Sequence, residues 1–446
     1  MAQDRRGGGR WMVAVTRRQG RGPDGAAGLL LCLVLVLCLA CPARAGHLTI
    51  DMMVGSRDKH TAWAALLDHF AAANPDIQIT HREVPMDLYW QRAGAKAGGP
   101  DAPDVAFWDS GKALRDGYAQ RVVAPLPPDL ARLVRDRFNP PAVDAVTVGA
   151  KVVAVPLSTY PWGFFYRKSL FRRLNLAPPR TWEELLAVAA RLKAAGVTPF
   201  AYGAQENWPL FAWFDYLDLR LNGLDFHRRL LAGHIPFTDP AARAVMARWQ
   251  LLLDRGYFHA PQPGDSWRET LPYFYHQQVG MLLLGGFAAM HFSPLVRDDV
   301  GFFPFPTLTP GMPRYEDVPQ DVLVVAPRAA ARPEVQHFVR FLAETAELDR
   351  FNTDLAMVSP LRDGQGDMGP APADAGTFFE DAGRQVLEDA AGFAAYFDRD
   401  ATTPLTAVAG GVFRRFMAPP HDIDAALAEL ERARTAATGM VQPGGH

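Results

Sequence analysis

Hydrophobic residues recur along residues 48–108 with spacings that predict one helix between strands. Within Lys59 to Ala73, apolar side chains at positions 63, 66, 67 and 70 follow the i, i+3, i+4, i+7 spacing of a helix with one buried face. Asn74-Pro75 ends this helix. Apolar runs around it predict strands over Leu48–Val54, Ile77–Val84 and Val105–Trp108. This β-α-β order predicts a parallel sheet with helices on both faces.

The alternation of strands and helices starts again after residue 180, which predicts a second α/β unit. Thr181 followed by Glu184 is the pattern of a capping box at a helix start. Pro209 and Asp239-Pro240 are expected to open further helices, the first of them closed by Asn222-Gly223. The other predicted elements are strands over Val197–Tyr202, Val279–Leu284, Val300–Phe305 and Val322–Ala326, a helix from Pro333 to Leu342, and a mostly helical tail over 373–437. Because no disordered linker separates the units, the chain is expected to cross between them more than once.

Composition and charge narrow the class of protein. The chain has 446 residues, of which 49% are hydrophobic and 21% charged, as in globular proteins. Single cores stop growing beyond about 250–300 residues, so two or more lobes are expected. Without the seven arginines and two aspartates of residues 1–45, 39 basic and 46 acidic residues remain, a net charge of −7. This balance argues against a nucleic-acid partner, which would need a basic surface.

The N-terminal segment has the pattern of a secretory signal peptide over residues 1–45. Arginines precede an apolar run, Leu29–Ala40, that is shorter than the roughly 20 residues needed to span a bilayer. Ala43 and Ala45 supply the small residues that signal peptidase reads, so cleavage is expected before Gly46. We therefore expect an exported, periplasmic protein. The alternatives are an uncleaved membrane anchor and a lipid anchor at Cys41.

The chain after Gly46 contains no cysteine, because Cys32, Cys38 and Cys41 all precede it. It can form no disulfide and no cysteine-based zinc site. The histidines do not have the spacing of metal ligands, and no phosphate-binding or dinucleotide-binding glycine motif is present. We expect no metal and no cofactor.

A series of short motifs is similar to those of the family 1 extracellular solute-binding proteins. They occur in the family's order from Gly46 to about residue 440, and the most specific is Pro179-Arg180-Thr181-Trp182-Glu183-Glu184-Leu185. The others include residues 67–77 (LDHF and NPDI), 102–108 (APDVAFW), 166–171 (YRKSLF) and 280–287 (GMLLLGGF).

The resemblance implies a type II periplasmic-binding-protein clamp of the α/β class. Each lobe would hold a mostly parallel sheet flanked by helices, and a hinge would close the lobes on the ligand. The implied division is a signal peptide (1–45), a first lobe (46–156, with a return segment 305–355) and a second lobe (157–304, with a C-terminal helical segment 356–446). The chain would cross between the lobes near Val155–Tyr160, Phe303–Leu308 and Phe351–Pro360.

The same resemblance implies that the protein captures a sugar or sugar-like solute and delivers it to the permease of an ABC importer. The protein would be a monomer and no enzyme. Aromatic rings stack on the C–H faces of sugars, and charged or planar polar groups bind the hydroxyls. The candidate ligand-binding residues that fit these needs are Ser56, Arg57, Trp108, Asp109, Tyr160, Trp162, Asn207, Trp208, Gly286, Phe287 and Asp321.

Other interpretations of these residues remain open. Trp108 could be a core tryptophan, Ser56 and Arg57 a solvated loop, and Tyr160 with Trp162 part of the hinge packing. Phe287 stands where the family commonly has tryptophan, so a maltose-like specificity is not implied. A secreted glycoside-acting enzyme would need two facing carboxylates, for which the candidates are Asp109, Asp215 and Asp321. A sensory sugar-binding protein without a transporter is the third interpretation.

Overall fold

The computed structural model describes residues 46–85, 89, 101–262, 264–362 and 377–439. The predicted signal peptide, its cleavage site and Cys41 lie outside these residues. The described residues from Gly46 onward belong to one compact unit. None of the helices in the described part of the chain is both long enough and apolar enough to cross a lipid bilayer.

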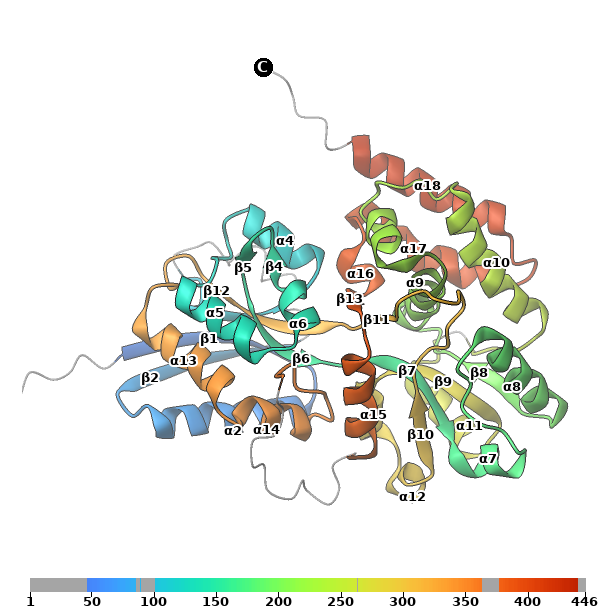
Figure 1. Ribbon diagram of the computed structural model, residues 1–446, viewed down its shortest axis with the longest axis horizontal. Coiled ribbons are helices and arrows are strands. Elements are labelled where there is room, and N and C mark those ends of the chain that lie inside the picture. Colours follow the sequence, from blue (N-terminus) through green and yellow to red (C-terminus); the bar gives the residue numbers. More distant parts are fainter. Residues whose placement is uncertain (1–45, 86–88, 90–100, 263, 363–376, 440–446) are drawn as a thin grey trace, which may run out of the picture. The chain divides into compact units, whose positions relative to one another are not determined.

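The first lobe is built on a five-stranded sheet in the order β2-β1-β3-β12-β6, with helices on both faces (Figure 1). β1 runs parallel to β2 and β3, whereas β12 is antiparallel to β3 and β6. The elements of this lobe are β1 (Gly46–Val54), α2 (Arg57–Ala73), β2 (Ile77–Pro85), β3 (Val105–Asp109), α4 (Lys112–Ala119), α5 (Pro128–Arg137), α6 (Pro140–Ala145), β4 (Thr147–Val148), β5 (Lys151–Val152), β6 (Val155–Thr159), β12 (Gln320–Val325), α13 (Pro333–Glu344) and α14 (Glu347–Asp354).

The second lobe contains a four-stranded sheet in the order β10-β7-β9-β8. β7 is antiparallel to both β10 and β9, and β8 is parallel to β9. The elements of this lobe are β7 (Trp162–Arg167), α7 (Lys168–Arg173), α8 (Trp182–Ala194), β8 (Thr198–Ala201), α9 (Trp208–Leu231), α10 (Pro240–Asp254), η1 (Trp267–Glu269), α11 (Thr270–Tyr275), β9 (Val279–Gly285), η2 (Gly286–His291), α12 (Pro294–Arg297), β10 (Val300–Phe303), β11 (Tyr315–Asp317), α15 (Thr377–Glu388), β13 (Gly392–Ala394), α16 (Phe397–Asp400), α17 (Thr403–Phe416) and α18 (Ile423–Gly439).

The two-lobed α/β class is confirmed, but the sheets are mixed rather than mostly parallel. In each lobe one strand enters from the other lobe and runs against its neighbours. β12 joins the first sheet after the chain has passed through the second lobe, and β7 follows directly from β6 of the first. A strand that arrives from outside a βαβ series need not share its direction, which explains the antiparallel pairs.

The predicted helix in residues 59–73 buries the face that its spacing indicates. Trp63, Leu66 and Phe70 of α2 are fully or almost fully buried. Trp63 meets Phe351 of α14 edge-on at 5.0 Å, and Phe70 meets Phe338 of α13 at 5.1 Å. The core of the first lobe therefore joins residues near 50–155 with residues near 320–360.

The core of the second lobe joins residues 162–305 with the C-terminal helices. α16 and α17 pack on α9, and α18 packs on α10 (Figure 1). Phe305 stacks on Tyr216 of α9 with ring centroids 5.0 Å apart, and Thr307 pairs with Thr181. Residues 305–307 thus lie with the second lobe, where the sequence analysis placed the start of the return to the first. The exact division of the chain into lobes stays a prediction.

Adjacent segments link the two sheets. β6 leads into β7 through Tyr160 and Pro161, and β11 leads into β12. Thr159 at the end of β6 exchanges two backbone hydrogen bonds with Val358, at 2.9 and 3.1 Å. These segments place residues of both lobes side by side around Tyr160.

Two predicted helix signals, the capping box at Thr181 and the helix-ending Gly223, are present, but the second helix continues past its signal. Thr181 Oγ1 accepts the N–H of Glu184 at 3.2 Å while Glu184 Oε2 accepts the N–H of Thr181 at 3.3 Å, so the capping box of α8 is confirmed. Gly223 adopts φ +82°, as expected for a glycine that ends a helix. A further helical stretch follows it at once, so α9 continues to Leu231 with a kink.

Candidate functional site

A group of charged side chains meets where the lobes join; we call it the charged cluster. It consists of Lys59, Asp109, Asp321 and Arg399, with the Tyr160 hydroxyl. Lys59 Nζ lies 3.1 Å from Asp321 Oδ2, and Arg399 Nη1 lies 3.2 Å from Asp109 Oδ1 and 3.7 Å from Asp321 Oδ1. Arg399 Nη2 donates a hydrogen bond to Tyr160 Oη at 2.7 Å.

The sheet and two helices position these side chains. Asp109 ends β3 and stands opposite Asp321 of the antiparallel β12, so both side chains leave the sheet on one face. Lys59 lies on the inner face of α2, where its ammonium is 4.6 Å from the centre of the Phe107 ring. Arg399 comes from α16 of the second lobe, so the charged cluster contains residues of both lobes.

Three polar atoms of the charged cluster have no hydrogen-bond partner in the described part of the chain. They are Asp109 Oδ1, Asp321 Oδ1 and Arg399 Nη1. Asp109 and Asp321 are only 8% and 2% exposed. Buried polar atoms are normally satisfied, because an unmade hydrogen bond in the interior costs about 1–3 kcal/mol. Arg399 Nη1 forms ion pairs with both oxygens but no hydrogen bond, so all three atoms can still make one to a group placed among them.

The electrostatics of the cluster shift the titration of its members. Burial raises the pKa of Asp109 to about 7; the Arg399 guanidinium opposes this rise and the Asp321 carboxylate adds to it. Burial lowers the pKa of Arg399, but Asp109, Tyr160 and Asp321 outweigh it and raise that pKa above its ordinary value. Arg399 is therefore charged at every pH at which the protein is folded, whereas Asp109 can change its charge near neutral pH.

A set of aromatic rings lies beside the charged cluster; we call it the aromatic cluster. Its rings meet at centroid distances of 5.1–6.1 Å, mostly edge to face. It consists of Tyr160, Trp162, Trp208, Trp267, Phe287 and Tyr396. Tyr160 belongs to both clusters, since its ring lies 6.0 Å from Phe287 and its hydroxyl binds Arg399.

The aromatic cluster also offers a polar atom. Trp162 Nε1 is buried and has no hydrogen-bond partner among the described residues. Trp208 and Phe287 are only partly buried. The Tyr396 hydroxyl donates to the main-chain oxygen of Trp208, which fixes the start of α9 against the C-terminal segment. Aromatic surface and hydrogen-bonding atoms therefore lie next to each other.

The structure brings six of the predicted site residues together. Asp109, Tyr160 and Asp321 belong to the charged cluster, and Trp162, Trp208 and Phe287 belong with Tyr160 to the aromatic cluster. Trp108 lies elsewhere: it is 6% exposed in the core of the first lobe, where its ring faces Gly117 of α4. Alternate residues of a strand point to opposite faces, which separates Trp108 from its neighbour Asp109.

The other four predicted residues have local structural roles or lie at the surface. Ser56 Oγ caps α2 by accepting the N–H of Lys59 at 3.1 Å, and Arg57 is exposed on its first turn. Asn207 packs against Gly410 and its Oδ1 accepts from Arg414. Gly286 is buried where an added Cβ would lie 2.3 Å from the Phe379 ring, so glycine permits this contact.

Lys59 and Arg399 were missed by the sequence analysis. Lys59 carries a signal, because it precedes Trp63 by four residues and so falls in the apolar stripe of its helix. A lysine at such a position needs a buried anion. Arg399 carries no comparable signal. Its partners lie nearly 80 or more residues away in the chain, and only the folding of α16 against the first lobe brings it to them.

The third carboxylate candidate, Asp215, lies inside the second lobe. It is fully buried on α9, and its Oδ2 accepts the N–H of Phe397 at 2.9 Å. It therefore holds the start of α16 and is not part of the charged cluster. Among the described residues, no group of three histidine, cysteine or acidic side chains is arranged to hold a metal ion.

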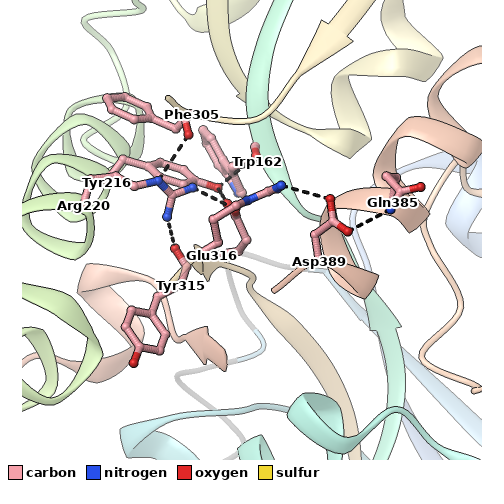
Figure 2. A network of polar contacts seen from close by, with 9 residues as sticks. Trp162, Tyr216, Arg220, Phe305, Tyr315, Glu316, Gln385 and Asp389 are labelled. Atoms are coloured by element: carbon pink, nitrogen blue, oxygen red, sulfur yellow. Dashed lines mark hydrogen bonds and ion pairs between the residues drawn. The ribbon is translucent and has the colours of Figure 1, made fainter. Parts of the chain in front are cut away.

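A second buried polar network connects α9 with the segments that cross between the lobes (Figure 2). Arg220 Nη2 lies 2.7 Å from Glu316 Oε1, and its Nε donates to the Phe305 oxygen at 3.2 Å. The Tyr216 hydroxyl lies 2.8 Å from the main-chain oxygen of Trp162 and 3.1 Å from Glu316 Oε2. This network joins α9 to the strand that carries Trp162.

The sequence is similar to known extracellular binding proteins. A family model of the bacterial extracellular solute-binding proteins matches residues 55–348. An uncharacterized ABC transporter extracellular-binding protein of Pyrococcus horikoshii is 27% identical over 205 residues, which cover 43% of this chain and 47% of the relative. The chain thus spans about half the length of that relative. The multiple sugar-binding protein of Streptococcus mutans is 24% identical over 343 residues, covering 72% and 78% of the two chains.

Solved structures share the fold. The bacterial solute receptor AcbH, described as having an exclusive preference for β-D-galactopyranose, superposes with a TM-score of 0.77 at 22% identity. The match covers 90% of this chain and 99% of that one. At this identity the likeness establishes the type II two-lobed architecture. Since the family model matches well over half of the chain, this protein belongs to the bacterial extracellular solute-binding protein family.

Proposed function

We propose that the protein binds a neutral sugar or sugar-like solute between its lobes and delivers it to the permease of an ABC importer. The observation that carries this proposal is the convergence of Asp109 Oδ1, Asp321 Oδ1 and Arg399 Nη1, all buried and without hydrogen-bond partners among the described residues. They lie beside a wall of aromatic rings.

A sugar hydroxyl matches these atoms because it donates one hydrogen bond and accepts others. It would donate to a carboxylate oxygen of Asp109 or Asp321 and accept from Arg399 or from Trp162 Nε1. Hydrogen bonds to charged groups are the stronger ones, about 1.5–3 kcal/mol each. The partly exposed faces of Trp208 and Phe287 suit the C–H faces of a sugar ring.

The charge balance favours a neutral solute. With both carboxylates ionised, Lys59 and Arg399 bring two positive charges, and Asp109 and Asp321 bring two negative ones. A charged solute would leave one of these buried groups without its counter-ion, which is costly in the interior. The names of the relatives also support this choice, because one is a multiple sugar-binding protein and another belongs to an ABC transporter.

Binding without catalysis fits the site better than the enzyme interpretation. Asp109 and Asp321 share Arg399 as a counter-ion, and Asp321 is also bound by Lys59. This pairing suits carboxylates that accept hydrogen bonds from a ligand, and the family model that matches this chain describes solute-binding proteins. Release of free sugar from an oligosaccharide by the purified protein would support the enzyme. A sensory role would be supported by sugar binding without any permease partner.

Localisation and assembly are further parts of this proposal. We propose that the protein is exported to the periplasm as a monomer, with residues 1–45 acting as the signal peptide. The match to an extracellular family supports export. The mass of the mature protein decides between cleavage before Gly46 and a lipid anchor at Cys41.

A thermal-shift screen of the chain from Gly46 onward tests the function. A ligand that binds only the folded state raises the unfolding midpoint by mass action. Monosaccharides, disaccharides, oligosaccharides and polyols form the panel, with phosphorylated sugars and dipeptides as other classes. We expect one neutral class to raise the midpoint. A shift confined to phosphorylated sugars or peptides would contradict the proposal.

Substitution of Arg399 tests the site with the sugar that the screen identifies. Arg399→Ala removes a charged donor, so we expect binding to lose about 1.5–3 kcal/mol of free energy. The dissociation constant should therefore rise at least tenfold. Arg415→Ala is the matched control, because Arg415 is an exposed arginine of the C-terminal helices that pairs with Glu429. Equal affinities of the two variants in calorimetric titration would remove Arg399 from the site.

A further inference from the structure

A cavity of about 370 Å³ is lined by residues of both lobes. The first lobe contributes residues from the start of α4 and from the segment between α6 and β4. The second contributes the end of α9 and the chain around β13 and α16. None of the residues of the charged or aromatic clusters lines this cavity. It is therefore a site apart from the proposed sugar site.

The polar groups around the cavity are mostly hydrogen-bond donors. Arg228 lines it at the end of α9, where one guanidinium nitrogen, Nη2, donates to the Phe393 oxygen at 2.8 Å. That bond fixes the group in the wall, and its other nitrogens have no partner within the described residues. Arg115 lines the opposite wall and pairs with Asp400.

Ser110 adds a buried donor. Its residue is 1% exposed and lines the cavity, and in the described part of the chain its hydroxyl takes part in no hydrogen bond. It precedes Gly111, the N-cap residue of α4, and the start of this helix has no side-chain cap. The free N–H groups of a helix start favour a negative charge nearby. Ser110, the start of α4 and Arg228 thus favour an anion.

The charges of the lining agree with this. Three arginines and two aspartates line the cavity, together with His234. Asp400 is already neutralised by Arg115, and Asp144 is exposed. Arg229 has only a long contact of 3.5 Å to the exposed Asp225. The lining therefore carries an excess of positive charge, in contrast to the balanced charged cluster.

We propose that this cavity is a second binding site, for a small oxyanion such as a phosphate or carboxylate group. The planar guanidinium of Arg228 matches the spacing of two oxyanion oxygens, which is why arginine recurs in sites for these groups. The Ser110 hydroxyl donates to the same anion from the other lobe. An anion held by both lobes favours the lobe arrangement that brings these walls together.

Occupancy of the cavity is therefore coupled to solute binding, a step that rests on the proposed function. A ligand that favours one lobe arrangement shifts the population toward it, and the coupling between two ligands is reciprocal. The sugar must then change the affinity for the anion by the same factor by which the anion changes the affinity for the sugar.

Calorimetric titration of the chain from Gly46 onward with inorganic phosphate, and separately with citrate, tests the site without any sugar. We expect one binding site per chain, and a preference for one of the two probes identifies the group that it takes. Arg228→Gln and Ser110→Ala should each weaken binding, the first at least tenfold. Arg243→Gln is the control, because Arg243 is an exposed arginine of α10 that pairs with Asp424.

The outcomes separate the two proposals. Absence of a saturable site for either probe, or equal weakening in Arg243→Gln, overturns the anion site whatever the sugar screen shows. An anion site that persists when no sugar binds supports this site and contradicts the proposed function alone. Where both ligands bind, a sugar affinity that saturating anion leaves unchanged would overturn the coupling.

Discussion

At the scale of single residues, the protein keeps four charged side chains where its lobes meet. Asp109 and Asp321 are almost fully buried, and each lies near the same arginine. Burying a charge costs several kcal/mol unless it is paired and hydrogen-bonded, and here one oxygen of each carboxylate has no hydrogen bond within the described residues. Such an arrangement does not maximise stability. The arrangement instead suits a site in which a ligand completes the hydrogen bonds.

The raised pKa of Asp109 predicts a stability that falls as pH rises. Below about pH 4 this carboxyl is protonated in both the folded and the unfolded chain. Between about pH 4 and its folded pKa of about 7, the folded protein holds a proton that the unfolded chain has released. The free energy of unfolding therefore decreases across this range, by about 3 kcal/mol between pH 4.5 and 7.5.

Asp109→Asn isolates this contribution, because the substituted side chain does not titrate. Urea denaturation of both proteins at pH 4.5, 6.0 and 7.5 should show the wild type losing stability relative to the variant as pH rises. The other buried carboxylates titrate alike in the two proteins and cancel in the difference. Parallel pH dependences would show that Asp109 is ionised in the folded protein throughout this range.

At the scale of elements, local sequence signals decide where helices begin and long-range packing decides where some of them end. The capping box fixes the start of α8 at Thr181, and Asp239 caps α10 by accepting the N–H of Ala241 at 2.8 Å. Gly223 breaks the helical geometry of α9 as its residue type predicts. The helix nevertheless resumes, because the following turns bury Leu230 and Leu231 in the second core.

Thr181→Ala tests the capping box. The substitution removes the side-chain oxygen that accepts the N–H of Glu184, so we expect the free energy of unfolding to fall by about 1 kcal/mol. Glu183→Ala is the matched control, since Glu183 is exposed in the same turn and takes no part in the box. Chemical denaturation of both variants checks the difference, and an equal loss in the two would assign the effect to helix propensity.

At the scale of the whole molecule, the chain passes between its lobes several times, and buried polar contacts fix these passages. Arg220 is only 2% exposed and Glu316 is fully buried. They connect α9 with β11 and with the carbonyl of Phe305 (Figure 2). Arg314 extends the network to Asp389 at 3.0 Å, and Gln385 Nε2 donates to the same carboxylate at 2.9 Å. The crossing strands are thereby held on the second lobe.

Arg220→Met tests this network. The substitution leaves the buried Glu316 with Arg314 as its counter-ion and without its shorter ion pair, so we expect a loss of about 3–5 kcal/mol in the free energy of unfolding. The double variant Arg220→Met/Glu316→Gln removes the uncompensated charge and should recover part of this loss, which a double-mutant cycle by denaturant unfolding measures.

Arg340→Met is the control for this cycle, because Arg340 forms an exposed pair with Asp129. Such surface pairs contribute about 0–1 kcal/mol. A loss in Arg220→Met no larger than in the control, or no recovery in the double variant, would show that the buried pair does not stabilise the crossings.

The sequence by itself determined the class of the protein and most of its elements. The apolar stripe of α2, the capping box of α8 and the order of strands and helices depend on neighbours within a few turns of chain, so they can be read from spacing. The site candidates came from the resemblance to the family and from their places at strand ends, at the hinge or before a helix, and they stay predictions; those that the structure brings together are Asp109, Tyr160, Trp162, Trp208, Phe287 and Asp321.

Only the tertiary structure decided which of these residues meet. β12 enters the first sheet antiparallel and so sets Asp321 opposite Asp109, and α16 brings Arg399 to both of them. Because successive side chains of β3 point to opposite faces, Trp108 lies in the core of the first lobe and not beside Asp109. Lys59 of α2 meets Asp321 only in the folded protein. Such pairings depend on contacts between segments tens to hundreds of residues apart, and local spacing carries no information about them.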